Sequence, residues 1–79
     1  MNKTVDFYMS LPYSIVLTPL SKEDGGGWLA EIPLLPNCAS DGETEAEALV
    51  NVRDAMRGWL EVSIRHGDPI AEPEHTPVI

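Results

Sequence analysis

The longest periodic segment of the chain runs from Thr44 to Gly67. Apolar residues recur there at intervals of three and four positions, which places them on one side of an α-helix. These residues are Ala48, Leu49, Val52, Ala55, Met56, Trp59 and Leu60. Thr44 and Glu47 form the capping-box pattern that begins a helix, and Gly67 suits the left-handed position that ends one. The sequence therefore predicts one amphipathic helix of about 20 residues.

Two segments upstream of this helix alternate between apolar and polar residues with the period of a β-strand. They are residues 13–18 and residues 28–32. The faces that we expect to meet the helix carry Tyr13, Ile15, Leu17, Trp28, Ala30 and Ile32. The opposite, outer face of the sheet then carries Ser14, Val16, Thr18, Leu29 and Glu31.

The glycine-rich stretch between these segments, residues 21–27, predicts the turn of an antiparallel hairpin. Residues 37–40, "NCAS", follow two prolines and are interpreted as a short third strand, with residues 41–43, "DGE", as the next turn. The fold class is therefore α+β, with an antiparallel β-β-β sheet in one layer and the long helix in the other.

Both ends of the chain are expected to lie outside the central domain, residues 13–70. Residues 1–12 predict a short helix or arm that stops before Pro12, because a proline disfavours helical geometry at the residue preceding it. Residues 71–79 form an extended tail in this interpretation. Pro69 and Ile70 are candidates for a fourth, edge strand.

Composition narrows the classes of partner. Thirteen acidic residues against five Lys and Arg give a formal charge of −8, so nucleic acid is a poor partner and a basic protein a better one. A chain of 79 residues with one Cys has no internal disulfide. Small folds without stabilising cross-links often self-associate. We expect a homo-oligomer. No apolar run is long enough to span a bilayer and no signal peptide opens the chain, which favours a cytoplasmic location.

The reactive groups of the chain favour structural roles over catalysis. Cys38 is the only thiol, and no pattern places His66 or His75 beside it as a general base. The glycine run is followed by a strand, whereas a phosphate-binding loop leads into a helix. Four acidic residues lie close together in the sequence. We expect Asp41 and Glu43 in a loop turn, and Glu45 and Glu47 in the first turn of the helix, where the helix dipole favours negative charge. These positions explain the carboxylates as structural. We therefore expect no catalytic site, no metal, no cofactor and no enzymatic activity.

The outer face of the predicted sheet is the remaining unusual feature. Val16 and Leu29 are apolar residues that point away from the helix, which suggests that a second chain covers them. The candidate partner-binding residues are Val16, Trp28, Leu29, Glu31, Asp41 and Glu43.

Several stretches taken together resemble the HicB-like antitoxin family. They are "YSIVL", "GGGWLAEIPLLPNCASDGETEAEALVNVRDAM" and "GDPIAEP", which match a hairpin ending in Pro-x-Leu-Pro-Gly-Cys, a Gly-Asp/Glu-Thr helix entry, and a terminal Ile-Pro-x-Pro. The resemblance covers residues 7–73. Asn37 replaces the usual glycine, and Leu34 stands where an acidic residue is common.

The resemblance implies a β-β-β-α-β, partial ribonuclease-H-like fold that dimerises or forms larger assemblies. Family members neutralise HicA, a small basic toxin that cleaves mRNA. Glu31 is the nearest counterpart to the catalytic carboxylates of ribonuclease H, and one carboxylate cannot hold two metal ions. Complete HicB antitoxins continue into a DNA-binding domain for which this chain has no basic helix, so we expect no direct binding of nucleic acid.

Two functions follow as hypotheses. The first is an antitoxin-like protein of a HicA/HicB system that binds and neutralises a small basic toxin. The alternative is a stand-alone oligomeric domain, without a toxin partner, that binds a small ligand or persists as a relic.

Overall fold

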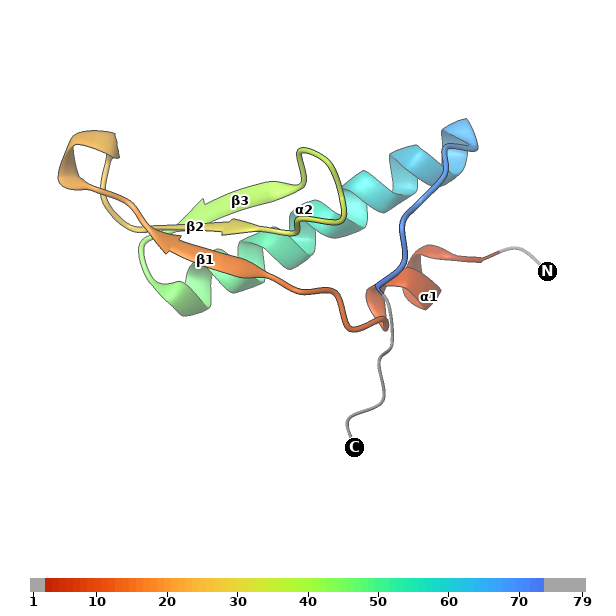
Figure 1. Cartoon of the computed structure of the whole chain (residues 1–79), viewed down its shortest axis with the longest axis horizontal. Helices are drawn as coiled ribbons and strands as arrows, with labels where there is room; N and C mark the ends of the chain where they lie inside the picture. Colours follow the sequence, from red (N-terminus) through yellow and green to blue (C-terminus); the bar gives the residue numbers. More distant parts are fainter. Residues whose placement is uncertain (1–2, 74–79) are drawn as a thin grey trace.

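The computed structural model describes residues 3–73. This part of the chain forms two α-helices, three strands and one short 3-10 helix. Figure 1 shows how they are arranged. In chain order these elements are α1 (Val5–Met9), β1 (Val16–Pro19), η1 (Lys22–Asp24), β2 (Trp28–Glu31), β3 (Ala39–Gly42) and α2 (Glu45–His66). The order confirms the predicted β-β-β-α core.

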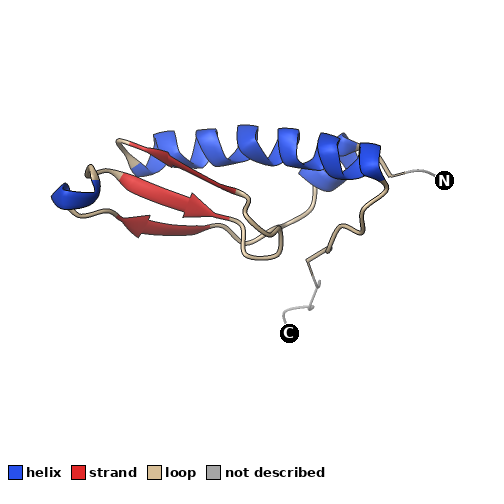
Figure 2. Ribbon diagram, turned by 90° about the horizontal axis from the view of Figure 1, so that it is seen from above, coloured by secondary structure: helices blue, strands red, loops and turns tan. Residues whose placement is uncertain are grey.

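The three strands form one antiparallel sheet in the order β1-β2-β3, with β2 in the centre. Figure 2 shows α2 running along one face of this sheet, so that the domain has two layers. None of the other described helices covers the opposite face. The predicted α+β fold class is therefore confirmed.

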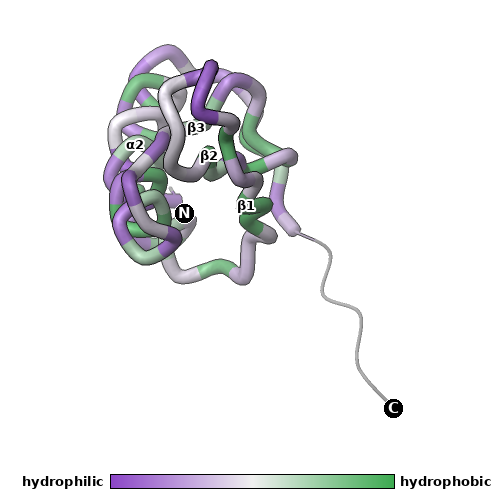
Figure 3. Tube along the Cα trace, turned by 90° about the vertical axis from the view of Figure 1, so that its left-hand side faces the viewer, coloured by the Kyte–Doolittle hydropathy of each residue, from purple (hydrophilic) through white to green (hydrophobic). Residues whose placement is uncertain are grey.

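Helix α2 begins and ends as its sequence predicts. The Thr44 hydroxyl accepts a hydrogen bond of 3.1 Å from the Glu47 backbone N–H, which satisfies one of the free donors of the first turn. Gly67 ends the helix in the left-handed conformation, with φ of 69°. In Figure 3 the trace of α2 alternates between hydrophilic and hydrophobic segments, as an amphipathic helix should.

The hydrophobic core lies between α2 and the inner face of the sheet. Its buried apolar residues are Tyr8, Ala30, Ile32, Leu35, Cys38, Ala48, Val52, Met56 and Leu60. Leu49 was assigned to the apolar side of the helix, and this assignment is wrong, because its side chain is 37% exposed. Ser63, near the end of the helix, is buried instead.

The third strand is displaced from its predicted position. It covers Ala39–Gly42, whereas residues 37–40 were expected, and the turn predicted at 41–43 therefore starts later. Asn37 has a left-handed backbone with φ of 64°, and the Cys38 N–H donates to the Leu35 carbonyl within the preceding loop. Pairing with β2 can begin only after these two residues. Asp41 consequently lies in a strand.

The first strand begins at Val16 and includes Pro19 as its last residue. Pro19 is tolerated there because β1 is an edge strand and no N–H is needed on its free side.

No fourth strand forms at Pro69 and Ile70 within the described residues, so that option is not realised. Ile70 packs against the core in an irregular conformation, and the Tyr13 hydroxyl donates a hydrogen bond to the Ala71 carbonyl. Lys3 forms an ion pair with Glu72. The segment after α2 thus returns toward the N-terminal residues, as Figure 1 shows. Residues 74–79 of the predicted tail lie outside the described part of the chain.

Candidate protein-binding surface

The outer face of the sheet is built from six residues, two on each strand. In an antiparallel sheet, residues directly opposite each other point to the same face. Val16 pairs with Glu31, which pairs with Ala39, and this makes one row. The second row consists of Thr18, Leu29 and Asp41.

This face combines an apolar centre with two carboxylates. Val16 is 46% exposed, and Leu29 on the central strand is half-buried although α2 lies on the other side of the sheet. Glu31 and Asp41 are exposed and diagonal to each other across β2 and β3. Within residues 3–73, neither carboxylate is in an ion pair. The face therefore offers a small apolar area with unpaired negative charge beside it.

Four of the six residues predicted to bind a partner are brought together here: Val16, Leu29, Glu31 and Asp41. The other two lie elsewhere. Trp28 alternates to the inner face, where it is half-buried and packs against the core. Glu43 lies in the short connection between β3 and α2.

Alternation along the first strand placed Thr18 on this face correctly, although Thr18 was not among the binding candidates. Sequence reasoning missed Ala39 as a member of the face and Leu34 as an exposed apolar residue of the following loop. Leu34 is 42% exposed in the loop between β2 and β3. Alternation from Ala39 to Asp41 was a usable signal for Ala39, but it was hidden by ending the third strand too early. Nothing in the local pattern distinguishes exposed Leu34 from Leu35, which is 1% exposed.

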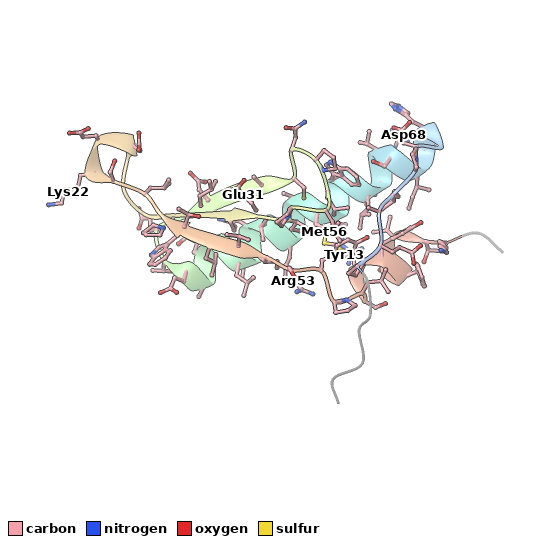
Figure 4. The ribbon with its side chains drawn as sticks, in the orientation of Figure 1. Tyr13, Lys22, Glu31, Arg53, Met56 and Asp68 are labelled. Carbon is pink, nitrogen blue, oxygen red and sulfur yellow. The ribbon has the colours of Figure 1, made fainter. Side chains whose placement is uncertain are left out.

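Negative charge is concentrated in the sheet half of the molecule. Residues 13–52 hold seven Asp and Glu and a single cation, Lys22. Three of the five Lys and Arg residues lie on α2 instead: Arg53, Arg57 and Arg65. Figure 4 shows Lys22 at the tip of the hairpin and Arg53 on the helix, both away from Glu31. The sheet half therefore carries a negative electrostatic field.

One acidic cleft of about 410 Å³ lies between the hairpin turn and the start of α2. Residues 25–27, Asp41, Gly42, Glu43 and Glu47 line it. The strand and helix come close there because Gly42 has no side chain, and a Cβ on it would lie 2.3 Å from the Ala48 nitrogen. Asn51 strengthens the contact by donating a 2.8 Å hydrogen bond to the Asp41 carbonyl.

These acidic residues do not form a metal centre. Within residues 3–73, no three His, Cys, Asp or Glu side chains are grouped so that they could hold a metal ion. Glu47 is engaged through its backbone N–H in the helix cap. The cleft therefore adds to the negative field of the sheet half.

The single thiol is part of the core. Cys38 is 3% exposed, and burial raises the pKa of its thiol. A higher pKa lowers the thiolate fraction near neutral pH, and the thiolate is the reactive form. His66 is exposed in the last turn of α2. The surroundings of Cys38 thus favour packing over nucleophilic chemistry.

Comparison with known proteins assigns the chain to a family. It is 32% identical to a UPF0150 protein of Thermoplasma acidophilum over 60 residues, which is 76% of this chain and 83% of the relative. Two UPF0150 proteins of Synechocystis are 34% and 36% identical, over 70% and 78% of this chain and 70% and 81% of the relatives. The chain belongs to the UPF0150 family. This is a family of small HicB-like proteins.

The matches to UPF0150 proteins span most of each chain, so the shared unit includes both the sheet and the helix. No family model matches the sequence. No solved structure matches it either. In the described part of the chain, no helix has the length and apolar character needed to cross a membrane.

Proposed function

We propose that this UPF0150 protein acts as a HicB-like antitoxin, which binds a small basic mRNA-cleaving toxin of the HicA type and neutralises it. The proposed contact surface is the outer face of the sheet. In this proposal the protein has no catalytic role of its own, acts in the cytoplasm, and does not bind nucleic acid directly.

The observation that carries the proposal is the uncovered outer face. It places Leu29 and Val16 next to Glu31 and Asp41, and α2 packs on the other side of the sheet. Protein interfaces commonly have an apolar core surrounded by polar groups, and complementary charge accelerates encounter and fixes orientation. A basic protein supplies the charge that this face lacks.

A small-molecule ligand is less well supported. The acidic cleft has a volume in the range of ligand sites, which is about 300–1,000 Å³, but such sites are lined mainly by apolar and aromatic side chains. This cleft is lined by glycines and carboxylates. The alternative of a stand-alone ligand-binding domain therefore has no specific observation in its favour.

Self-association belongs to the proposal as a separate element. The buried core contains nine apolar residues in the described part of the chain, which is little for an unsupported domain. Face-to-face pairing of two copies through the outer sheet face would bring Glu31 and Asp41 of both chains together. We therefore propose a homo-oligomer that leaves the outer sheet face free. Light scattering of the purified protein measures the size of this oligomer.

The direct test uses the small basic protein that this proposal expects to be encoded beside the chain. We expect the two proteins to co-purify at low salt, the complex to weaken at high salt, and added antitoxin to suppress mRNA cleavage by the neighbour. Leu29→Asp should reduce binding, whereas Val50→Asp, on the exposed side of α2, should not. Absence of a complex at low salt, or equal binding by both variants, would contradict the proposal.

A further inference from the structure

A second cleft, of about 260 Å³, lies where β2 ends and the loop to β3 begins. Residues 31–33 and 35–39 line it. Glu31 and Ala39 face each other across the sheet and belong to the outer face, so the cleft is continuous with the proposed docking surface. Its volume is below the range of about 300–1,000 Å³ that small-molecule sites occupy. A single side chain of a partner fits this size better than a metabolite.

The loop that forms the cleft is held by several hydrogen bonds. The Ile32 N–H donates to the Cys38 carbonyl, the Leu35 N–H to Ile32, and the Cys38 N–H to Leu35, each at 3.0 Å. Outside the loop, the Trp59 indole N–H donates to the Pro36 carbonyl at 2.9 Å. Ile32, Leu35 and Cys38 are buried beneath it. A cleft fixed in this way loses little conformational entropy on binding, which favours affinity.

The chemistry of the lining selects a cation with an apolar stem. Pro33, Pro36 and Ala39 present exposed apolar surface, and Glu31 is the only charged side chain of the lining. Lys and Arg pack their methylene groups along apolar surface while the charged head remains at the edge. The Glu31 carboxylate lies at the sheet end of the cleft and has no ion-pair partner within residues 3–73.

We propose that this cleft receives one Arg or Lys side chain of a basic protein partner, with its charged head on Glu31 and its stem against Pro33 and Pro36. The inference rests on the proposed antitoxin function and names the contact that anchors the partner. A second copy of this chain is a poorer source of the cation. Each copy has a formal charge of −8, and the homo-oligomer proposed above leaves the outer sheet face, where the cleft opens, free.

The test is a double-mutant cycle between Glu31 and the partner's basic residues. Glu31→Lys should weaken binding of the neighbouring basic protein about tenfold or more, as expected for a close charge pair at an interface. Glu23→Lys is the matched control, because Glu23 is an exposed carboxylate on η1 outside the cleft. It should change the affinity by less than about threefold, through long-range charge only. One Arg or Lys of the partner, changed to Glu, should restore binding to Glu31→Lys and not to Glu23→Lys.

The outcomes separate this inference from the proposed function. If the unmodified proteins bind and the toxin is inhibited, but Glu31→Lys and Glu23→Lys behave alike, the anchoring role of the cleft is overturned while the antitoxin function stands. If Glu31→Lys changes the oligomeric state instead of the affinity, the cation comes from a second copy and the partner assignment is overturned. If the unmodified proteins do not bind, both proposals are overturned. Circular dichroism of each variant confirms that its helix content is unchanged.

Discussion

The Trp59 indole Nε1–H donates a hydrogen bond of 2.9 Å to the backbone carbonyl of Pro36, and this contact ties the loop between β2 and β3 to the helix. The two residues are 23 positions apart in the chain. The bond spans the two layers of the domain at the place where Cys38 is buried. It therefore holds in position the loop that forms the smaller cleft.

We expect Trp59→Phe to lower the free energy of unfolding by about 1 kcal/mol for the lost hydrogen bond, in addition to the effect of the smaller ring. Trp28→Phe is the control, because Trp28 is also half-buried but does not donate to this loop. The labelling rate of Cys38 by a thiol reagent should rise in Trp59→Phe and stay near the unmodified rate in Trp28→Phe. Equal labelling of the two variants would show that the bond does not hold the loop.

Gly42 is the point of closest approach between β3 and α2. A Cβ at this position would lie 2.3 Å from the Ala48 nitrogen and 2.9 Å from its Cα, so the backbone must move to accept any side chain. We expect Gly42→Ala to destabilise the protein by about 3 kcal/mol, the upper range for overpacking. Urea unfolding followed by circular dichroism measures the loss. A change below the error of the measurement would mean that the helix and strand are farther apart.

Gly58, in the interior of α2, has room for a side chain, unlike Gly42 on β3. A Cβ there would meet no atom within 4 Å, and the residue is exposed in the interior of α2. Gly58→Ala should therefore stabilise the protein by about 0.5–1 kcal/mol, because alanine loses less backbone entropy in a helix than glycine does. The midpoint of urea unfolding should rise with an unchanged slope. A fall in stability would indicate that another chain packs closely at Gly58.

Tyr13 links the first strand to the segment after α2, and its ionisation makes stability depend on pH. Burial, and then the negative charge of Glu72, raise the pKa of Tyr13 above its ordinary value of 10.0. A group whose pKa is higher in the folded state stabilises the fold below its unfolded pKa and loses this effect as the pH rises through the folded value. The neutral hydroxyl is also the form that donates to the Ala71 carbonyl.

The difference in unfolding free energy between the unmodified protein and Tyr13→Phe should therefore be largest at about pH 8 and shrink toward about pH 11. Tyr8→Phe is the comparison variant, because its hydroxyl is not bonded to Ala71. Urea unfolding at the two pH values provides the measurement. A Tyr13→Phe difference that stays constant over this interval would show that Tyr13 ionises equally in the folded and unfolded chains.

The sequence predicted which residues of β1 and β2 lie on the outer face of the sheet, but it did not predict the complete candidate surface. Alternation placed Val16, Leu29 and Glu31 on the outer face correctly, since successive residues of a strand point to opposite sides. Asp41 joined them only because β3 extends two residues beyond its predicted end. That extension depends on pairing with Trp28, which lies far from Gly42 in the sequence. The cleft beside Glu31 also requires the pairing of β2 with β3, because Glu31 and Ala39 both line it.

The sequence by itself determined the features that depend on neighbouring residues: the long helix with its Thr44 and Gly67 ends, the short helix before Pro12, and the hairpin around the glycine run. Helix caps and strand alternation act over a few residues, so they can be read from local order. Only the tertiary structure decided the start of β3, the burial of Leu35 beside exposed Leu34, and the hydrogen bond from Trp59 to Pro36. These features depend on the register between strands and on the position of the helix across the sheet, which bring together residues that no local pattern connects.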